Sequence, residues 1–202
     1  MAKLRLGVLA SHNGSNMRAL HRASLAADGL FEVAIVLSNN SGSGALEYAR
    51  EHGVSARHMS GRTHPDPVAL DDAIRAVLVE HEVGLVVTAG YMRKLGPGVR
   101  SEFSGRIINI HPALLPKHGG HGMWGIRVHE AVLAAGDAVS GPSVHLVDEE
   151  YDTGAVLAQR EVPVLAGDSA ESLAARVLAA EHDLLPRVVA DIAREHAARA
   201  SR

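Results

Sequence analysis

An amide and an imidazole stand two residues apart in the segment Asn109-Ile110-His111, directly after the β-branched pair Ile107-Ile108. Residues two apart on an extended backbone point to the same side, so both side chains can aim hydrogen-bond donors at one reacting oxygen. Pro112 and Pro116 follow, and they stop a helix from carrying the chain onward. Because strand ends are where α/β proteins bind ligands, this pair indicates acyl-group chemistry.

Asp152 adds a carboxylate in the sequence Tyr151-Asp152-Thr153-Gly154, which on its own is typical of a simple turn. If this carboxylate reaches His111, it favours the imidazolium and raises the pKa of His111. A charged imidazole can act as a general acid and as an oxyanion stabiliser. We therefore expect Asn109, His111 and Asp152 to be the catalytic residues.

A phosphate site is the second candidate, at Gly14-Ser15-Asn16 between the first expected strand and the first expected helix. Backbone N–H groups at a helix start, together with the helix dipole, bind a phosphate-sized anion. The alternative is a tight turn in which Ser15 or Asn16 caps the helix. A dinucleotide fits less well, because the Gly-x-Gly-x-x-Gly pattern is missing and Ser38-Asn39-Asn40 lacks an acidic residue for the ribose.

Four histidines at positions 111, 118, 121 and 129 raise a metal-binding alternative. Their spacing matches neither the His-Glu-x-x-His pair nor a finger pattern, and the surrounding glycines suggest a loop that would hold ligands poorly. We expect no metal. The chain has no cysteine, which excludes disulfides and a cysteine nucleophile, and no serine lies in a Gly-x-Ser-x-Gly elbow.

The composition of the 202-residue chain predicts a single domain with a self-sufficient aliphatic core, since 47% of residues are hydrophobic but only 3% are aromatic. The net charge of −3 gives no reason to expect a nucleic-acid or membrane partner. We find no signal peptide and no apolar run of membrane-spanning length. The expectation is a cytoplasmic protein, monomer or homodimer, that acts on small molecules.

The elements that must position these groups alternate between strand and helix in the first half of the chain. Strands are expected at 4–10, 32–38, 55–59, 84–89 and 105–110, and helices at 15–27, 45–52 and 68–82. This alternation predicts an α/β fold with a central, mostly parallel sheet flanked by helices. The second half predicts a loop at 112–125, a helix at 126–135, strands at 143–147 and 155–164, and a helix from Ser169 to about Ala198, opened by the capping pattern Ser169-x-x-Ser172.

Several of these motifs together resemble the 10-formyltetrahydrofolate-dependent formyltransferases. Residues 109–116, Asn-Ile-His-Pro-Ala-Leu-Leu-Pro, resemble the Asn-x-His-x-Ser-x-Leu-Pro signature of that family, and Asp152 matches its motif aspartate. Residues 11–16, 86–95, 162–169 and 181–182 resemble the branch of the family that serves purine synthesis. The resemblance covers about residues 4 to 190. It implies a Rossmann-like formyltransferase fold with a mixed C-terminal part, a phosphate-binding half at about 1–100 and a catalytic and folate half at about 101–202.

The resemblance also implies the reaction: formyl transfer from the co-substrate 10-formyltetrahydrofolate to the amine of 5-phosphoribosylglycinamide, in de novo purine (IMP) biosynthesis. In this interpretation Asn109 binds folate and stabilises the oxyanion, His111 is the acid, and Asp152 tunes His111. The remaining implied contacts are Gly14, Ser15 and Asn16 to the phosphate, Glu181 to the glycinamide, and Met92, Arg93, Lys94 and Leu95 to folate. The family further implies a cis peptide bond at Leu115-Pro116.

The chain departs from the family pattern at three places. Ala113 replaces the usual serine, and the loop Lys117 to Arg127 is several residues longer than the common form, which suggests a lid. The folate-side arginine of the family aligns near Pro67, where Arg62 could substitute for it. Length argues against the additional domains of methionyl-tRNA formyltransferases and of formyltetrahydrofolate deformylases.

Three alternatives remain open at this point. The acceptor could be another amine, such as an amino sugar nucleotide, or water could replace the amine, which would make the protein a formyltetrahydrofolate hydrolase. A binding module without turnover is the non-enzyme alternative, against which the presence of all three catalytic residues argues.

Overall fold

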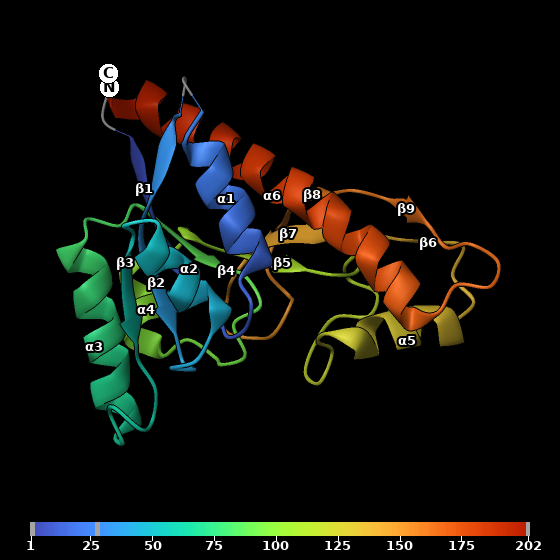
Figure 1. Cartoon of the computed structure of the whole chain (residues 1–202), viewed down its shortest axis with the longest axis horizontal. Coiled ribbons are helices and arrows are strands. Elements are labelled where there is room, and N and C mark those ends of the chain that lie inside the picture. The colour runs from blue at the N-terminus through green and yellow to red at the C-terminus, as the bar shows by residue number, and fades with distance from the viewer. Residues whose placement is uncertain (1–2, 27–28, 201–202) are drawn as a thin grey trace. The chain divides into compact units, whose positions relative to one another are not determined.

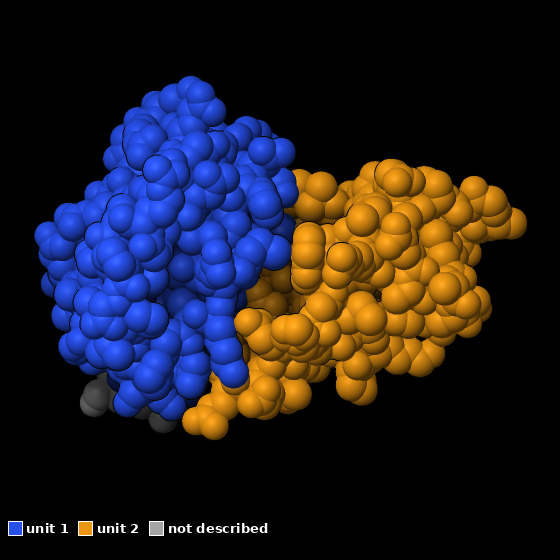
Figure 2. All heavy atoms as spheres, turned by 90° about the horizontal axis from the view of Figure 1, so that it is seen from below, with its two compact units in different colours: residues 1–108, 189–202 blue, residues 109–188 orange. Residues whose placement is uncertain are grey.

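The computed structural model describes residues 3–26 and 29–200, with the side chain of residue 200 left out. The chain divides into two compact units, one formed by residues 1–108 and 189–202 and the other by residues 109–188 (Figure 2). No helix among the described residues is long and apolar enough to cross a membrane.

The first unit is built from alternating strands and helices (Figure 1). In chain order these are β1 (Leu4–Leu9), α1 (Ser15–Ser24), β2 (Phe31–Ser38), α2 (Gly44–Glu51), β3 (Ser55–His58), α3 (Pro67–Glu80), β4 (Leu85–Thr88), α4 (Pro97–Glu102) and the start of β5 (Ile107–His111). Strand β1 pairs in parallel with β2 and β4, and β2 pairs in parallel with β3. Helices α1 and α2 contact each other, as do α3 and α4.

Apolar side chains on both faces of its strands make the core of the first unit. Leu6, Val8 and Leu9 of β1 are fully buried, as are Val86 and Val87 of β4. Such continuous apolar runs are typical of strands that helices cover on both faces. Phe103 is the largest of the fully buried side chains, so aliphatic residues fill most of this core, as the composition predicts.

The second unit carries the mixed part of the fold. It contains the end of β5, α5 (Ile126–Ala134), β6 (Val139–Ser140), β7 (Ser143–Leu146), β8 (Val156–Gln159), β9 (Val162–Pro163) and the first part of α6 (Ala170–Ala200). Strands β7 and β8 pair antiparallel, and β6 and β9 form a separate antiparallel pair. The order in the main sheet is β3-β2-β1-β4-β5-β7-β8. Leu173 and Val177 of α6 pack with Val132 and Val162 in a small apolar cluster.

Most of the elements predicted from the sequence are confirmed within one to two residues, and so is the mostly parallel sheet. Ser169 and Ser172 form the predicted capping pair: the Ser169 N–H donates to the Ser172 hydroxyl at 3.0 Å, and the Ser172 N–H donates to the Ser169 hydroxyl at 3.2 Å. The first helix was expected to run to about Ala27, which itself lies outside the described residues, but α1 ends at Ser24.

Three predictions about the elements are wrong. The N-cap of α1 is Gly14, without a side-chain cap, and neither Ser15 nor Asn16 fills that position. The single strand expected at 155–164 is two strands, β8 and β9, that pair with different partners. Helix α4 and strand β6 were not predicted, because six and two residues are too short for a periodic pattern.

Candidate functional site

Strand β5 carries Asn109 and His111 at its carboxyl end. It runs from Ile107 to His111, so Asn109 and His111 lie two apart near its carboxyl end and share one side of the strand. The side chain of His111 is only 4% exposed. The β-branched pair before them is buried and fixes the strand against the core. The strand thus holds both polar side chains at a defined register.

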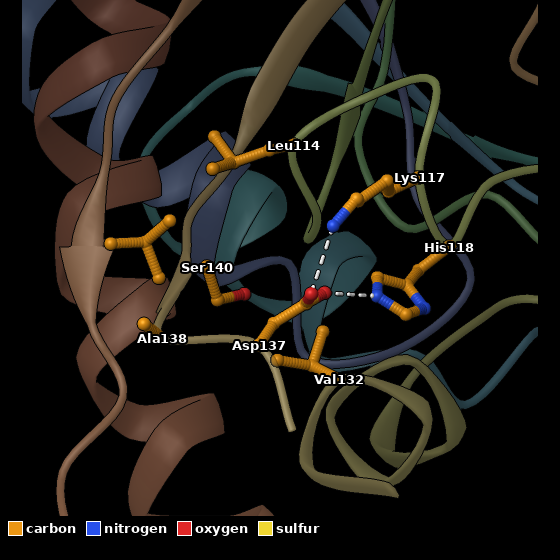
Figure 3. Close-up of a pocket in the computed structure, with 8 residues that line it drawn as sticks. Leu114, Lys117, His118, Val132, Asp137, Ala138 and Ser140 are labelled. Carbon is orange, nitrogen blue, oxygen red and sulfur yellow. Dashed lines mark hydrogen bonds and ion pairs between the residues drawn. The ribbon is translucent and has the colours of Figure 1, made fainter. Parts of the chain in front are cut away.

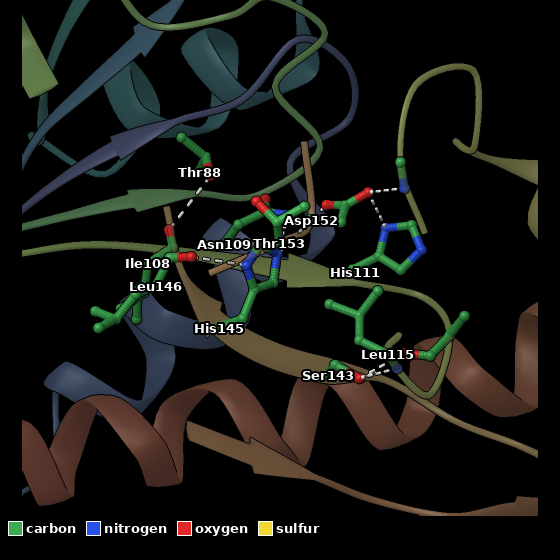
Figure 4. Close-up of polar contacts among 12 residues, drawn as sticks. Thr88, Ile108, Asn109, His111, Leu115, Ser143, His145, Leu146, Asp152 and Thr153 are labelled. Atoms are coloured by element: carbon green, nitrogen blue, oxygen red, sulfur yellow. Dashed lines mark hydrogen bonds and ion pairs between the residues drawn. The ribbon is translucent and has the colours of Figure 1, made fainter. Parts of the chain in front are cut away.

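Asp152 lies beside His111, as the sequence predicted. Its Oδ2 is 3.4 Å from Nδ1 of His111, and its own side chain is 9% exposed (Figure 4). This distance exceeds the 2.7–3.2 Å of an N–H···O hydrogen bond, so the two groups face each other without a closed bond. Asp152 has φ 60°, a left-handed conformation that few residues other than glycine adopt, and aspartate is among those that tolerate it.

His145 joins this group, and the sequence argument missed its role. Nε2 of His145 lies 3.0 Å from Nδ2 of Asn109 and 3.4 Å from Oδ1 of Asp152 (Figure 4). Its Nδ1 donates to the carbonyl of Leu146 at 2.8 Å, which fixes the orientation of the ring so that Nε2 faces both side chains. His145 therefore links Asn109 to Asp152. Its inward position in the predicted strand 143–147 is the sequence signal that could have identified it.

The glycine- and histidine-rich loop contacts the same residues through its backbone. Nε2 of His111 donates to the carbonyl of His118 at 2.8 Å, and the N–H of Gly120 donates to Oδ2 of Asp152 at 2.9 Å. A Cβ atom at Gly119 would lie 3.2 Å from Cβ of Asp152 and 2.5 Å from Cδ2 of Leu115, so a larger residue would require the Leu115 side chain to move. Because Nε2–H of His111 donates to the His118 carbonyl, the neutral ring carries its proton on Nε2. The unprotonated Nδ1 is the nitrogen that faces Asp152.

The pKa of His111 is lower than its ordinary value, which corrects the prediction that Asp152 would raise it. Burial of the ring is the largest influence and lowers the pKa, since an imidazolium loses its hydration there. Asp152 and the His118 carbonyl act in the predicted direction but are outweighed. Burial also raises the pKa of Asp152, but contacts with His145, His111 and Gly120 reverse this and lower it. At neutral pH the pair is therefore a neutral imidazole beside a carboxylate.

A titration of the His111 ring by NMR should give a pKa below 6.5, its ordinary value. In an Asp152→Asn variant the pKa should fall further, because the carboxylate that favours the imidazolium is gone while the burial remains. If neutral His111 is the working form, kcat should decline as pH falls through this pKa. A His111 ring that titrates above 6.5 in the unmodified protein would contradict this account.

The predicted phosphate loop lies in the first unit, where β1 leads into α1. Gly14 has φ 67°, and a Cβ atom there would lie 2.6 Å from Cβ of Ala45 on α2. No side chain caps α1, and a helix start is a place where backbone N–H groups and the helix dipole favour an anion. The N–H of Ala45 donates to the carbonyl of His12 at 3.1 Å, which ties the loop to the start of α2.

The predicted folate segment also lies in the first unit, directly after β4. The hydroxyl of Ser11 accepts from the N–H of Met92 at 2.7 Å, so this segment is anchored to the loop after β1. Met92, Arg93 and Lys94 are exposed, whereas Leu95 is buried. Glu181 lies on α6 with its side chain 7% exposed. The binding roles of these residues remain predictions.

The histidines of the loop and its flanks face separate partners rather than one centre. His118 contacts Asp137, and His121 lies beside the ring of Tyr151 at 5.9 Å between centroids. Within residues 3–26 and 29–200, no cluster of three or more histidine, aspartate or glutamate side chains could hold a metal ion.

The turn after His111 has the geometry that the resemblance implied, with a cis bond at Leu115-Pro116. Ala113, where the family has serine, is fully buried, and its carbonyl accepts a hydrogen bond from Ser143 Oγ at 2.6 Å. Arg62, the suggested folate-side substitute, is exposed in the turn before α3, so its role also remains a prediction.

Comparison with known proteins places the chain among formyl transferases. A family model described as formyl transferase matches residues 4–189. The chain is 43% identical over 195 residues to the chloroplastic phosphoribosylglycinamide formyltransferase of Vigna unguiculata, covering 95% of this chain and 61% of that protein. It thus spans about three fifths of the plant relative.

The chain covers a larger share of its bacterial relatives than of the plant protein. The phosphoribosylglycinamide formyltransferase of Escherichia coli is 37% identical over 186 residues, covering 92% of this chain and 85% of that protein. The crystal structure of the protein of the same name from Brucella melitensis matches with a TM-score of 0.88 and 40% identity, covering 95% of this chain and 96% of that one. These similarities confirm both the resemblance and the fold class that were inferred from the sequence.

Proposed function

The chain belongs to the formyl transferase family, and we propose that it transfers the formyl group of 10-formyltetrahydrofolate to the amine of 5-phosphoribosylglycinamide in purine synthesis. The relatives named for this activity support the choice of substrates. The observation that carries the proposal is the buried contact of Asp152 with His111 and, through His145, with Asn109. Formyl-folate is a co-substrate in this reaction, and none of its steps calls for a metal ion.

The lowered pKa of His111 assigns it two successive roles. The neutral ring carries its proton on Nε2, so Nδ1 can accept the proton that the amine loses when its nitrogen bonds to the formyl carbon. The imidazolium formed in this way is stabilised by Asp152, 3.4 Å from Nδ1. It then gives the proton to the folate nitrogen as the bond between that nitrogen and the formyl carbon breaks. His111 is thus a base first and the predicted acid second.

Asn109 is assigned to the oxygen of the formyl group. When the amine adds, the carbonyl oxygen becomes an oxyanion that needs fixed donors. We assign the Asn109 amide, whose nitrogen lies 3.0 Å from Nε2 of His145, to the stabilisation of this oxygen. Because β5 and His145 hold the amide in place, little reorganisation is required when the charge develops.

The substrate-binding roles are assigned residue by residue. The first unit contains the loop Gly14, Ser15 and Asn16, to which we assign the 5-phosphate, and the segment from Met92 to Leu95, to which we assign folate. The second unit contains the reacting residues and Glu181, to which we assign the glycinamide portion. The cytoplasmic location and the monomeric or dimeric state remain predictions, and two plant relatives are named as chloroplastic.

A Gly14→Ala variant should lose about 1–3 kcal/mol of unfolding free energy, because alanine is strained at φ 67° and its Cβ would meet Ala45 at 2.6 Å. Its KM for phosphoribosylglycinamide should also rise, since the N–H groups of the loop shift. Urea unfolding and initial rates would measure these effects. Gly61→Ala is the matched control, since a Cβ there meets nothing within 4 Å. An unchanged KM in a folded Gly14→Ala protein would remove the loop from the phosphate site.

Turnover of the purified protein tests the proposal directly. Loss of the formyl donor should require phosphoribosylglycinamide. Formate release without any acceptor would favour the hydrolase, turnover only with an amino sugar nucleotide would favour the other acceptor, and binding of formyl-folate without turnover would favour the non-enzyme alternative.

A further inference from the structure

A carboxylate outside the catalytic residues holds the loop that contacts them. In the second unit, Oδ1 of Asp137 accepts from Lys117 Nζ and Oδ2 accepts from His118 Nε2, both at 2.8 Å (Figure 3). Asp137 follows α5, so the contacts span about twenty residues of sequence. All three side chains line a cavity of about 340 Å³, together with apolar residues such as Leu114 and Val132.

The same short segment contacts the catalytic residues from its other side. While the His118 side chain is bound to Asp137, the His118 carbonyl accepts from Nε2 of His111 at 2.8 Å. Two residues later, the N–H of Gly120 donates to Asp152 at 2.9 Å. His118 has φ 53°, a conformation that side-chain-bearing residues usually avoid. A residue kept in this conformation needs contacts that hold it there, and its bond to Asp137 is one.

The position of the His118 carbonyl decides which nitrogen of His111 carries the proton. A neutral imidazole has one N–H, and the bond made by one nitrogen sets the state of the other. Asp152 alone would attract the proton to Nδ1, since the two face each other at 3.4 Å. The carbonyl at Nε2 competes with Asp152 for the same proton. Only when Nε2 keeps the proton can Nδ1 accept one from an attacking amine.

We propose that Asp137 is a positioning residue for formyl transfer: by holding His118, it keeps the His118 carbonyl on His111 and thereby maintains the reactive tautomer. The inference rests on the proposed function for its kinetic consequence, although the tautomer itself can be observed without substrate. The other charged or titratable groups around His111 are Asp152, His145, His118 and His129. All four remain when Asp137 is replaced, so a change in tautomer reports the loss of the Asp137 contact.

The test replaces Asp137 by alanine in the full chain. We expect kcat to fall about tenfold, since small displacements of catalytic groups cost up to about 10²-fold in rate, while the KM values for both substrates stay within about twofold. In ¹⁵N NMR spectra, the His111 signals should move from the Nε2–H tautomer toward the Nδ1–H tautomer. Asp137→Asn keeps one acceptor oxygen, so part of both effects should be recovered.

Two variants control for indirect effects. Ser140→Ala changes the wall of the same cavity, where the serine hydroxyl is buried without a hydrogen-bond partner, and it should leave kcat and the tautomer unchanged. Asp72→Ala removes an exposed carboxylate that pairs with Arg75 on α3. It should also leave kcat and the His111 tautomer unchanged.

The outcomes separate this inference from the proposed function. If the unmodified protein shows no turnover, the proposed function fails, but the NMR comparison still tests Asp137. If the unmodified protein turns over and neither the alanine nor the asparagine variant changes kcat or the His111 tautomer, the positioning role is overturned. A His118→Asn variant should reproduce the Asp137→Ala effects, and the double variant should be no worse than either. Fully additive losses would also contradict a shared path through His118.

Discussion

Replacement of His111 by alanine is expected to lower kcat by about 10²–10⁴-fold, the range typical of a lost general acid–base group. The loss should lie toward the upper end, because one ring serves both proton transfers. It accepts a proton at Nδ1, beside Asp152 at 3.4 Å, and then returns it to the leaving nitrogen. Single-turnover rates with 10-formyltetrahydrofolate would isolate this step from product release.

The His111 variant also needs a structural control, because the ring is buried and donates to the His118 carbonyl. Thermal unfolding should show a folded protein with a loss of stability in the range of about 0.5–3 kcal/mol that single substitutions usually cause. His196→Ala, at an exposed position on α6, should keep normal turnover. Turnover close to that of the unmodified protein in a folded His111→Ala variant would refute the assigned mechanism.

Replacement of Asn109 by alanine is expected to lower kcat by about 10²–10³-fold, as for other donors to an oxyanion. The effect should appear in kcat more than in KM for the amine, because the oxyanion exists only after the amine has added. Asn109→Asp is the sharper variant, since it keeps the shape of the side chain but replaces a donor with a negative charge. Steady-state kinetics with both substrates varied would separate the two constants.

A control for Asn109 is Asp72→Ala, which removes an exposed carboxylate that pairs with Arg75 on α3. It should leave kcat unchanged. If Asn109→Ala raised KM for folate while kcat stayed constant, the amide would be a binding contact, and the oxyanion would have to be stabilised by other groups.

The sequence predicted correctly those features of the structure that depend on a local pattern of residues. The buried run before Asn109 predicted a strand, and the two-residue period placed Asn109 and His111 on one side of it. The serines at 169 and 172 predicted the start of α6 because capping depends on neighbouring residues alone. The contact between Asp152 and His111 could be proposed because both residues matched one family signature. The distance between the two side chains could not be predicted.

The remaining features depend on contacts between distant residues or on a balance of opposing effects. No local signal placed the His118 carbonyl on His111, because a backbone group carries no residue identity. The pKa of His111 was predicted in the wrong direction since charge and burial oppose each other, and the extent of burial follows only from the complete fold. The break between β8 and β9 escaped prediction because strand pairing is decided by partners elsewhere in the chain.

The buried hydroxyl of Ser143 bears on how the turn after His111 tolerates change at position 113. This hydroxyl donates to the Ala113 carbonyl and accepts from the Leu115 N–H and from Gln159 Nε2, at 2.6, 3.0 and 2.8 Å. A serine hydroxyl can donate one hydrogen bond and accept two, so these three bonds use its full hydrogen-bonding capacity. Both bonds that it makes within the turn are to backbone groups. The turn is therefore anchored whatever small side chain stands at 113. These bonds hold the turn after His111 through its backbone, without any contribution from the Ala113 methyl group.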